Sequence, residues 1–559
     1  MVAMKVLSAA EMQACDRATA ERFGVPSLEL MRAAARAVAA FAREQFPHAR
    51  RVTVVCGRGN NGGDGMMAAR LLAESGLDVT TLLLGPPEKF AADAGEAWSE
   101  LLASARPGTV HVIESAEQMR GFASVLSTDL IVDAVVGTGF KPPLKGLALE
   151  AQALVRAAGA PVLAVDLPSG WAADSTAAAA EGEVFPADAV ITFTAPKPAH
   201  LFGQLTRQWK QPVAVAPIGS PEEAIVSSLG LAWAGGALEL VQQPRAAGAN
   251  KGSFGHVLVV GGSFGSAGGK AGAPAMAAYA ALKAGAGLVT AAVPAAAMAV
   301  AAAVAPELMT WPLAATEAGG IDAGNLAPER LTALTADKTV LAVGPGMGQP
   351  PETVKFVAGL LSATKQPAVI DADALNILAA KPVLLAKLAK GRTLVLTPHP
   401  GEMARLAGCT VAEVQAHRLE TARAFAQKMG VTVVLKGART IVAHPDGTAA
   451  VNTTGNPAMA KGGSGDVLCG LIAGLMAQHP ADAGRAVEAA VYLHGLAADL
   501  AVLRGDEHTL LATESLRKLG RAFQFRTGRL FRTNGLSGYV CLVGAAHCGA
   551  THAAASNEG

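Results

Sequence analysis

The sequence predicts two α/β domains, each built on a parallel sheet, and three observations support this fold class. The chain has 559 residues, which is too long for a single hydrophobic core. Short apolar runs alternate with helical stretches in both halves, as in βαβ units. Aromatic residues make up only 4% of the chain while glycines number 62, so we expect closely packed helices of small residues and glycine-rich strand ends.

The first half, residues 1–219, is expected to form a Rossmann-like three-layer domain with a parallel sheet. We expect its helices at 9–22, 27–46 and 65–75, and its strands at 51–56, 78–84, 130–135, 162–165 and 189–193. Parallel sheets of this kind bind ligands at the carboxyl ends of their strands. The loops that follow these strands are therefore the expected location of the chemistry.

A second α/β series is expected over residues 250–525, after a weakly patterned linker at 220–249 that contains Pro221, Gly235, Gly236 and Pro244. Its strands are expected at 255–261, 288–293, 339–343, 368–371, 393–396 and 432–436. From 526 to 559 the alternating pattern fails, and we expect disorder there.

Charge and cysteine usage exclude several classes of protein. The net charge of +1 comes without a long basic run, which argues against a nucleic-acid partner. The six cysteines are scattered without a CxxC pair, which argues against a zinc cluster or disulfide framework and suits a reducing compartment. The N-terminus has no apolar core of signal-peptide length. We expect a cytoplasmic homo-oligomer that binds small molecules and has no membrane partner.

The first glycine-rich loop follows the predicted strand RVTVVC and reads GRGNNGGDG over 57–65. Gly57, Gly59 and Gly62 satisfy the G-x-G-x-x-G pattern, in which missing Cβ atoms let backbone N–H groups approach a pyrophosphate at a helix N-terminus. The next strand ends in LLLG without the acid of an ordinary dinucleotide fold, which disfavours a plain dehydrogenase. The structural alternative is a tight strand-to-helix turn.

Two further loops, DAVVGTGFKPP at 133–143 and DLPSG at 166–170, also follow apolar strands. The carboxyl ends of parallel strands share one edge of the sheet, so these loops and the first one are expected to meet there. Their side-chain oxygens would suit a hard cation, and they belong to Asn61, Asp133, Asp166 and Ser169. The alternative is that Asp133 and Asp166 only cap loops.

The second candidate site is KGGSGD at 461–466, directly before an apolar helix at 467–476. We expect the amides of Gly463, Ser464 and Gly465 to form an anion hole at the helix start. Asp466 in the first turn is expected to be ionised, and a carboxylate beside an anion hole suits phosphoryl transfer. The alternative is an ordinary glycine-rich N-cap.

Four polar or glycine-rich loops at other strand ends support this second site. They are GPGMG at 344–348, Asp371 and Asp373 after the strand AVI, TPHPGE at 397–402 and KGART at 436–440. His399 stands between two prolines and would be presented rigidly, although a lone His is often structural. His494 lies in a predicted helix and is expected to belong to the core.

In the first half, GNNGGDG, DAVVGTG with the following PPLKG, DLPSG and TFTAPKP together resemble the YjeF N-terminal domain, the NAD(P)H-hydrate epimerase. The resemblance covers residues 1–219 and departs from the family at Arg58. It implies that Asp166 is catalytic at the reactive ring, and that a K⁺ ion binds at Asn61, Asp133 and Ser169. It also implies that the hydrated dinucleotide is held by Asn60, Asn61, Gly62, Gly63, Asp64, Gly137, Thr138, Gly139, Phe140, Lys141, Pro142 and Pro143.

The second half resembles the ribokinase-like superfamily through GGSGD, and more closely its ADP-dependent NAD(P)H-hydrate dehydratase branch. The closer match covers residues 250–525 and rests on KGSFGHVLVVGGS, AALKAGAGLVT, PELM, GPGMG, DADALN, TPHPGEMARL and LKGARTIV. It implies that ADP with Mg²⁺ contacts Lys436, Gly437, Ala438, Arg439, Thr440 and Gly465. It implies that the hydrated dinucleotide contacts Ala273, Gly348, His399 and Asp466.

Together the resemblances imply a repair sequence for hydrated NADH and NADPH: interconversion of the R and S forms, then dehydration of the S form with ADP, releasing AMP and phosphate. Asp466 is expected to deprotonate the C6 hydroxyl for attack on the terminal phosphorus, and Asp166 to handle protons while the C6–O bond opens and re-forms. Two alternatives stay open. The second half would otherwise be a small-molecule kinase, and the first half a non-enzymatic interaction module.

Overall fold

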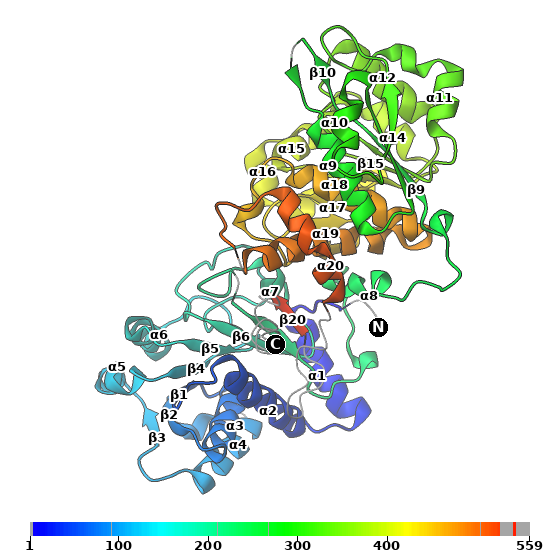
Figure 1. The fold of residues 1–559 in the computed structure, drawn as a ribbon. Coiled ribbons are helices and arrows are strands. Elements are labelled where there is room, and N and C mark those ends of the chain that lie inside the picture. Colours follow the sequence, from blue (N-terminus) through cyan, green and yellow to red (C-terminus); the bar gives the residue numbers. More distant parts are fainter. Residues whose placement is uncertain are drawn as a thin grey trace. The chain divides into compact units, whose positions relative to one another are not determined.

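A computed structural model describes residues 4–90, 92–209, 211–266, 268–503, 505–525 and 540–543. The chain divides into two compact units between Leu229 and Gly230 (Figure 1). The N-terminal unit runs from Met4 to Leu229 and takes up residues 540–543, and the C-terminal unit runs from Gly230 to Phe525. Each unit is an α/β domain with a largely parallel sheet, which confirms the predicted fold class.

The sheet of the N-terminal unit has eight described strands in the order β20-β7-β6-β5-β4-β1-β2-β3. The strands are β1 (Arg51–Cys56), β2 (Asp78–Leu84), β3 (Val110–Ile113), β4 (Leu130–Ala134), β5 (Val162–Val165), β6 (Ala189–Phe193), β7 (Val213–Ala216) and β20 (Val540–Val543). All pairs are parallel except β20 with β7. The strand order reverses between β4 and β1, so a ligand crevice is expected at the carboxyl ends of these two strands.

Helices cover both faces of this sheet. The helices are α1 (Ala9–Phe23), α2 (Ser27–Gln45), α3 (Asn60–Glu74), α4 (Ala92–Ser104), α5 (Ala116–Gly121), α6 (Gly146–Ala158) and α7 (Pro198–Phe202). Helix α3 packs on β1, β2 and β4, with α2 and α4 beside it. On the other face, Met119 of α5 and Val155 of α6 share a buried cluster with Val55 and Ile131. The result is the expected three-layer arrangement.

The C-terminal unit has a ten-stranded sheet in the order β13-β12-β9-β14-β15-β16-β17-β18-β19-β8. The strands are β8 (Leu231–Trp233), β9 (His256–Val260), β12 (Leu288–Pro294), β13 (Met309–Leu313), β14 (Val340–Val343), β15 (Ala368–Ile370), β16 (Leu394–Leu396), β17 (Thr432–Leu435), β18 (Ile441–Ala443) and β19 (Ala449–Val451). Pairing is parallel from β13 to β17 and antiparallel from β17 to β19. Here the order reverses between β9 and β14.

Small residues set the helix packing in this unit. Its longer helices are α9 (Gly272–Ala284), α11 (Pro328–Thr335), α12 (Pro351–Ala363), α14 (Pro382–Ala389), α15 (Pro400–Ala407), α17 (Arg418–Met429), α18 (Ser464–Gln478), α19 (Ala483–Val502) and α20 (Ala512–Gln524). A Cβ atom at Gly470 of α18 would lie 1.9 Å from the carbonyl oxygen of Ala277 in α9. The two helices therefore touch through their backbones, as the small-residue composition predicts. Among the described helices, none is long and apolar enough to cross a membrane.

The boundary between the two units falls inside the expected linker at 220–249, and the structure assigns the two parts of this segment to different units. Ser228 donates two hydrogen bonds of 2.7 Å to Glu11, which fixes the segment before Gly230 to the N-terminal unit. Beyond Gly230, strand β8 extends the C-terminal sheet by pairing with β19. Short elements, the 3₁₀ helix Glu222–Ala224 and strand β8, occupy the two sides of the boundary at Gly230.

The sequence predicts disorder throughout 526–559, and this prediction is wrong for residues 540–543. These residues form β20, which satisfies the backbone groups along the outer edge of β7. The remainder of that segment lies outside the described residues.

Candidate active sites

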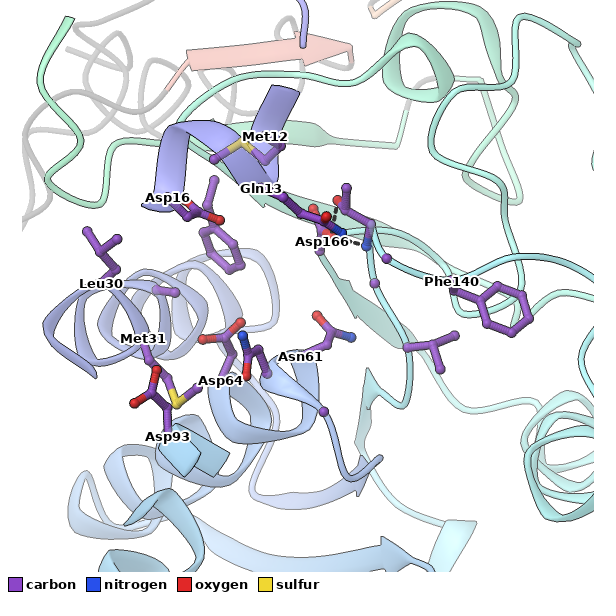
Figure 2. A pocket seen from close by; sticks show the side chains of 18 of the residues that line it. Met12, Gln13, Asp16, Leu30, Met31, Asn61, Asp64, Asp93, Phe140 and Asp166 are labelled. Carbon is purple, nitrogen blue, oxygen red and sulfur yellow. Dashed lines mark hydrogen bonds between the residues drawn. The ribbon is translucent and has the colours of Figure 1, made fainter. Parts of the chain in front are cut away.

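A pocket of about 610 Å³ opens at the reversal point of the N-terminal sheet (Figure 2). Its walls come from the segments after β1 and β4, as the topology predicts, and also from α1 and α2. Eight of the predicted dinucleotide-binding or catalytic residues line it: Asn60, Asn61, Asp64, Gly137, Thr138, Gly139, Phe140 and Asp166. Gly62, Gly63, Lys141, Pro142 and Pro143 are not among the lining residues.

The glycines after β1 are required by packing within the protein. Helix α3 begins at Asn60, five residues before its predicted start at Gly65, so the predicted loop is the first turn of the helix. A Cβ atom at Gly57 would lie 1.9 Å from the Val135 carbonyl oxygen, and one at Gly62 would lie 1.9 Å from the Gly57 carbonyl oxygen. These contacts hold the start of α3 against the end of β4. The glycine pattern therefore has a structural cause beyond any ligand.

Asp166 lies at the carboxyl end of β5 and is held by four hydrogen-bond donors. Its Oδ2 atom accepts bonds from the Thr138 amide at 2.6 Å and the Thr138 hydroxyl at 2.5 Å. Its Oδ1 atom accepts from the Thr192 hydroxyl at 2.8 Å and pairs with Lys197 Nζ at 3.0 Å. Burial alone would raise the pKa of Asp166, but the Lys197 charge and these bonds hold it below its usual range. Asp166 is therefore an ionised carboxylate facing the pocket.

The backbone around Asp166 is strained and braced. Asp166 has a φ of 66°, a left-handed conformation that non-glycine residues rarely adopt and that is found at functional sites. His200 Nδ1 accepts from the Lys197 amide, and its Nε2 atom therefore donates to the Asp166 carbonyl oxygen at 2.8 Å. Burial lowers the pKa of His200 to about 4, so the ring is neutral and acts as a brace.

Asp133 and Ser169, two of the predicted cation ligands, are directly bonded to each other beneath the pocket. Asp133 accepts from the Ser169 amide at 2.7 Å and from the Ser169 hydroxyl at 2.6 Å. Both side chains are fully buried, and burial raises the pKa of Asp133 to about 7. Asn61, the third predicted ligand, lines the pocket and has a buried amide nitrogen without a partner among the described residues.

Two more carboxylates face the same pocket from helices. Asp64 enters from α3 and Asp16 from α1, whereas Asp166 comes from the end of β5 (Figure 2). Burial raises the pKa of Asp16 to about 6 and places that of Asp64 well above its usual value. Sequence reasoning missed Asp16 and Lys197 as pocket residues. Lys197 lies in the quoted TFTAPKP motif, which was its only signal, whereas Asp16 had none.

The second candidate site lies at the N-terminus of α18, which begins at Ser464 with Gly463 as its N-cap. Gly463 has a φ of 94°, so glycine is required by the backbone at this position. The Ser464 amide donates to the Lys461 carbonyl oxygen at 3.4 Å, so the predicted set of three free amides is wrong at Ser464. Within the described chain, the amides of Gly465 and Asp466 in the first turn make no hydrogen bond.

Asp466 differs in one respect from the expectation of a readily ionised carboxylate. Burial, and then the charge of Asp371, raise its pKa to about 6, while Lys436 and Lys270 act in the opposite direction. A pKa near the working pH suits a general base, which must accept a proton and release it again.

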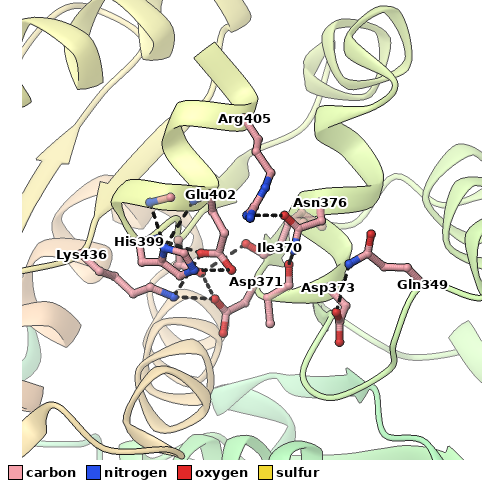
Figure 3. Close-up of polar contacts among 12 residues, drawn as sticks. Gln349, Ile370, Asp371, Asp373, Asn376, His399, Glu402, Arg405 and Lys436 are labelled. Atoms are coloured by element: carbon pink, nitrogen blue, oxygen red, sulfur yellow. Dashed lines mark hydrogen bonds and ion pairs between the residues drawn. The ribbon is translucent and has the colours of Figure 1, made fainter. Parts of the chain in front are cut away.

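Lys436 is the centre of a cluster of charges beside α18 (Figure 3). Its Nζ atom lies 3.0 Å from Asp371 Oδ1 and 3.8 Å from Glu402 Oε2. The Thr397 hydroxyl also donates to Asp371 at 2.7 Å. A Cβ atom at Gly465 would lie 3.5 Å from Lys436 Nζ. The cluster therefore adjoins the helix start, and sequence reasoning had assigned no role to Asp371 or Glu402 in it.

Two of the predicted dinucleotide contacts of this unit, Ala273 and Gly348, lie near the reversal point of its sheet. The Gly262 amide donates to the Pro345 carbonyl oxygen at 2.8 Å, which joins the loops after β9 and β14. Ala273, in the first turn of α9, lies beside Gly346. The Gly348 amide is already bonded to Asp373 at 2.9 Å, so this amide is not free for a ligand.

His399 is the N-cap of α15 and is half-exposed. Its Nδ1 atom accepts from the amides of Gly401 at 3.0 Å and Glu402 at 3.3 Å. The proton is therefore on Nε2, which lies 3.5 Å from Glu402 Oε1. The geometry is compatible with both interpretations of this residue. Its Nδ1 atom caps the helix, which is a structural role, and its Nε2–H group is held in a fixed position where a ligand could bind it. His494 is buried in α19, as expected.

The predicted nucleotide-binding segment 436–440 forms the turn between β17 and β18. Gly437 and Ala438 are exposed there. Burial lowers the pKa of Arg439 to about 10, and its guanidinium donates to the Thr453 carbonyl oxygen. The Thr440 hydroxyl donates to the Gly437 carbonyl oxygen. The turn therefore presents its backbone outward and keeps its long side chains engaged within the unit.

Comparisons with known proteins assign both halves. The NAD(P)H-hydrate dehydratase family matches residues 257–520, and the YjeF-related protein N-terminus matches residues 27–199. The bifunctional NAD(P)H-hydrate repair enzyme Nnr of Moorella thermoacetica is 40% identical over 531 residues, which cover 92% of this chain and 95% of the relative. The Escherichia coli enzyme of the same name is 35% identical, over 90% of this chain and 91% of the relative.

Among solved structures, an ADP/ATP-dependent NAD(P)H-hydrate dehydratase from Bacillus subtilis, co-crystallised with ATP and Mg²⁺, is 32% identical. It covers 51% of this chain and 96% of its own, with a TM-score of 0.43.

Proposed function

The chain belongs to the family of bifunctional NAD(P)H-hydrate repair enzymes, and we propose that it carries out both reactions of that name. Residues 1–219 interconvert the R and S forms of hydrated NADH and NADPH. Residues 250–525 dehydrate the S form with ADP and release AMP and phosphate. The observation that supports this most is that each matched segment has its own cluster of buried carboxylates at the carboxyl edge of its own sheet.

In the N-terminal unit, the pocket would hold the hydrated nicotinamide ring near Asp166. Opening of the C6–O bond leaves a positive charge on the ring, and an ionised carboxylate stabilises such a charge. The four donors to Asp166 keep it ionised and fixed in place. Asn60, Asn61, Asp64 and the 137–140 segment would hold the rest of the dinucleotide.

A K⁺ ion fits the residues beneath this pocket. Asp133 and Ser169 present side-chain oxygens, the Val136 carbonyl oxygen lies 3.0 Å from Ser169 Oγ, and Asn61 lines the wall above. Oxygen atoms are the ligands that hard cations prefer. Asp133 has no basic partner among the described residues, and a bound cation would supply the charge that keeps it ionised.

In the C-terminal unit, Asp466 would take the proton from the C6 hydroxyl as the oxygen attacks the terminal phosphorus of ADP. The free amides of Gly465 and Asp466 and the Lys436 ammonium would face the transferred phosphate. Elimination of phosphate then restores the double bond, because phosphate leaves far more readily than hydroxide. Magnesium would arrive with the nucleotide as part of the substrate.

Two assays on the purified chain test this proposal. With hydrated NADH, ADP and Mg²⁺, the near-ultraviolet absorbance of NADH should return, and AMP and free phosphate should appear in equal amounts. Without ADP, a pure S or R form should relax to the mixture of both. A stable phosphorylated product would favour the kinase alternative, and failure to speed the relaxation would favour an interaction module for residues 1–219.

A reducing, cytoplasmic compartment, as the scattered cysteines predict, is part of this proposal. The homo-oligomeric state stays a prediction.

A further inference from the structure

Asp16 is a pocket carboxylate to which the proposed function gives no role. It reaches the pocket from α1, whereas Asp166 reaches it from the end of β5 (Figure 2). Its Oδ1 atom is buried and has no hydrogen-bond partner in the described part of the chain. A carboxylate oxygen without a donor is costly to ionise in such a place. The position therefore suits a protonated carboxyl group that has a proton to give.

The balance of charges in the pocket leads to the same protonation state. Three carboxylates, those of Asp16, Asp64 and Asp166, share the pocket with a single buried ammonium, that of Lys197. Lys197 Nζ lies 3.0 Å from Asp166 Oδ1 and forms no ion pair with a second carboxylate among the described residues. Arg58 and Asp93 also line the pocket, and neither pairs with Asp16. Asp16 and Asp64 therefore have no cationic partner among the described residues, which favours their neutral forms.

The pKa values of the three groups separate their roles. Burial raises the pKa of Asp16 to about 6, while Lys197 keeps that of Asp166 below its usual range. Burial and the charges of Asp166 and Asp16 raise the pKa of Asp64 well above its usual value, which favours its protonated form. Neighbouring carboxyl groups with opposite shifts are typical of acid and base pairs. Asp16 is then the group that can release a proton near neutral pH.

We propose that Asp16 is the general acid of the epimerisation and that it acts on the opposite side of the ring from Asp166. This inference rests on the proposed epimerase function and deepens it. Inversion at C6 requires departure of the hydroxyl from one face and return of water to the other. Two carboxyl groups that approach from α1 and from β5 supply one group for each face.

The steps balance. The C6–O bond breaks as the Asp16 proton moves to the hydroxyl oxygen, one water molecule is released, and the ring-nitrogen lone pair becomes the second bond between N1 and C6. The ring is then a cation, and Asp16 is ionised. Water adds to the other face of C6 beside the ionised Asp166, its proton passes through pocket water to Asp16, and the electron pair returns to N1. Asp16, whose pKa is the higher of the two, is then protonated again, which resets the site.

The test measures epimerisation of the purified S form without ADP, by chromatography, across about pH 5 to pH 8, with the uncatalysed rate subtracted at each pH. In the full-length wild-type chain, kcat/KM should fall tenfold per pH unit above about pH 6, because the protonated fraction of Asp16 falls. Asp16→Asn should lower kcat/KM on the order of 100-fold and remove this descending limb. Asp16→Glu should restore part of the rate together with the limb. Glu21→Gln removes an exposed carboxylate from the same helix and should change neither.

The outcomes separate this inference from the function on which it rests. A wild-type chain that does not epimerise the hydrate would overturn the proposed function itself. An active wild type without the descending limb would overturn the role of Asp16, whether or not the variants fold. The role of Asp16 would also be overturned if kcat/KM of Asp16→Asn still fell above about pH 6. A residue that only supports the structure would lower the rate equally at every pH.

Discussion

The two units place similar sequence signals in different physical settings. Each has a glycine-rich segment at the start of a helix, α3 in one and α18 in the other. At α3, backbone atoms fill the space that a side chain would need. A Cβ atom built on Gly62 would lie 1.9 Å from the Gly57 carbonyl oxygen. At α18, the nearest atoms to a Cβ atom on Gly465 are the ends of side chains, 3.5 Å away at Lys436 Nζ. A glycine at a helix start can therefore serve packing in one site and ligand access in another.

The charges differ as well. In the N-terminal pocket, Lys197 pairs with Asp166, and the carboxyl groups of Asp16 and Asp64 have raised pKa values that favour their protonated forms. Beside α18, the ammonium of Lys436 pairs with both Asp371 and Glu402, and Lys270 also lowers the pKa of Asp466. The first setting suits proton transfer at a ring that becomes positive. The second adds the free amides of Gly465 and Asp466 to the ammonium groups of Lys436 and Lys270, which suits an anionic phosphate.

The largest expected effect is that of Asp466→Asn on dehydration. Loss of a well-placed general base costs on the order of 100-fold or more, and epimerisation at the other site should continue at its wild-type rate. Burial, and then Asp371, raise the pKa of Asp466 to about 6, and the base must be ionised to act. The wild-type kcat/KM for dehydration should therefore fall as pH drops below about 6, opposite in sign to epimerisation.

The return of NADH absorbance measures dehydration at each pH, and chromatography without ADP measures epimerisation in the same preparation. Retention of more than about a tenth of the wild-type dehydration rate by Asp466→Asn would exclude Asp466 as the base.

The next effect concerns stability, and it tests whether the glycines after β1 serve packing. Gly62→Ala would place a methyl group 1.9 Å from the Gly57 carbonyl oxygen, and such overpacking costs roughly 1–3 kcal/mol or more. Gly59→Ala is the matched control, because a Cβ atom there meets nothing within 4 Å. Hydrogen exchange of the α3 amides should be much faster in Gly62→Ala and nearly unchanged in Gly59→Ala. Equal protection in both variants would contradict the packing explanation.

Strand positions could be predicted closely from the sequence. The predicted bounds of β1, β2, β5 and β6 agree with the structure at both ends, because each is a short apolar run between polar or glycine-rich segments. The start of α3 was missed because Gly-Gly-Asp-Gly has a poor helix propensity, which tertiary packing overrides here. Strand β20 was missed although its sequence VCLV is apolar and β-branched, since no alternating pattern surrounds it.

Site residues that belong to a sequence motif could be predicted. Site residues that lie close to the motif only in the folded chain could not. Asp166 and Asp466 follow from loops at strand or helix ends. Asp16 comes from a helix about 150 residues earlier in the chain than Asp166, and Glu402 meets Lys436 only because β16 and β17 are neighbours. Protonation depends on these partners, so the raised pKa of Asp466 could not be read from its place in the first turn of a helix.

A smaller effect is expected for Gly465→Ala, the counterpart of Gly62→Ala at the second site. Its methyl group would make ordinary contacts, at 3.5 Å from Lys436 Nζ and 3.9 Å from Asp371 Oδ2. The unfolding temperature should therefore stay the same or rise slightly. The methyl group would, however, stand between the cluster and a bound phosphate. One added methyl group in a binding site costs about tenfold or more in affinity. Calorimetric titration with ADP and Mg²⁺ measures the loss, and unchanged affinity would indicate that Gly465 does not face the nucleotide.

The smallest expected effect separates the two interpretations of His399. Asn is among the best N-cap residues, so His399→Asn should keep the cap of α15 that the imidazole now forms with Gly401 and Glu402. The Nε2 donor would be lost, and one neutral hydrogen bond is worth about 0.5–1.5 kcal/mol. The KM for the hydrated dinucleotide should therefore rise roughly twofold to tenfold with little change in kcat. His399→Ala, which also removes the cap, should in addition lower the unfolding temperature. If KM stays at the wild-type value in His399→Asn while His399→Ala is destabilised, then His399 serves only to begin the helix.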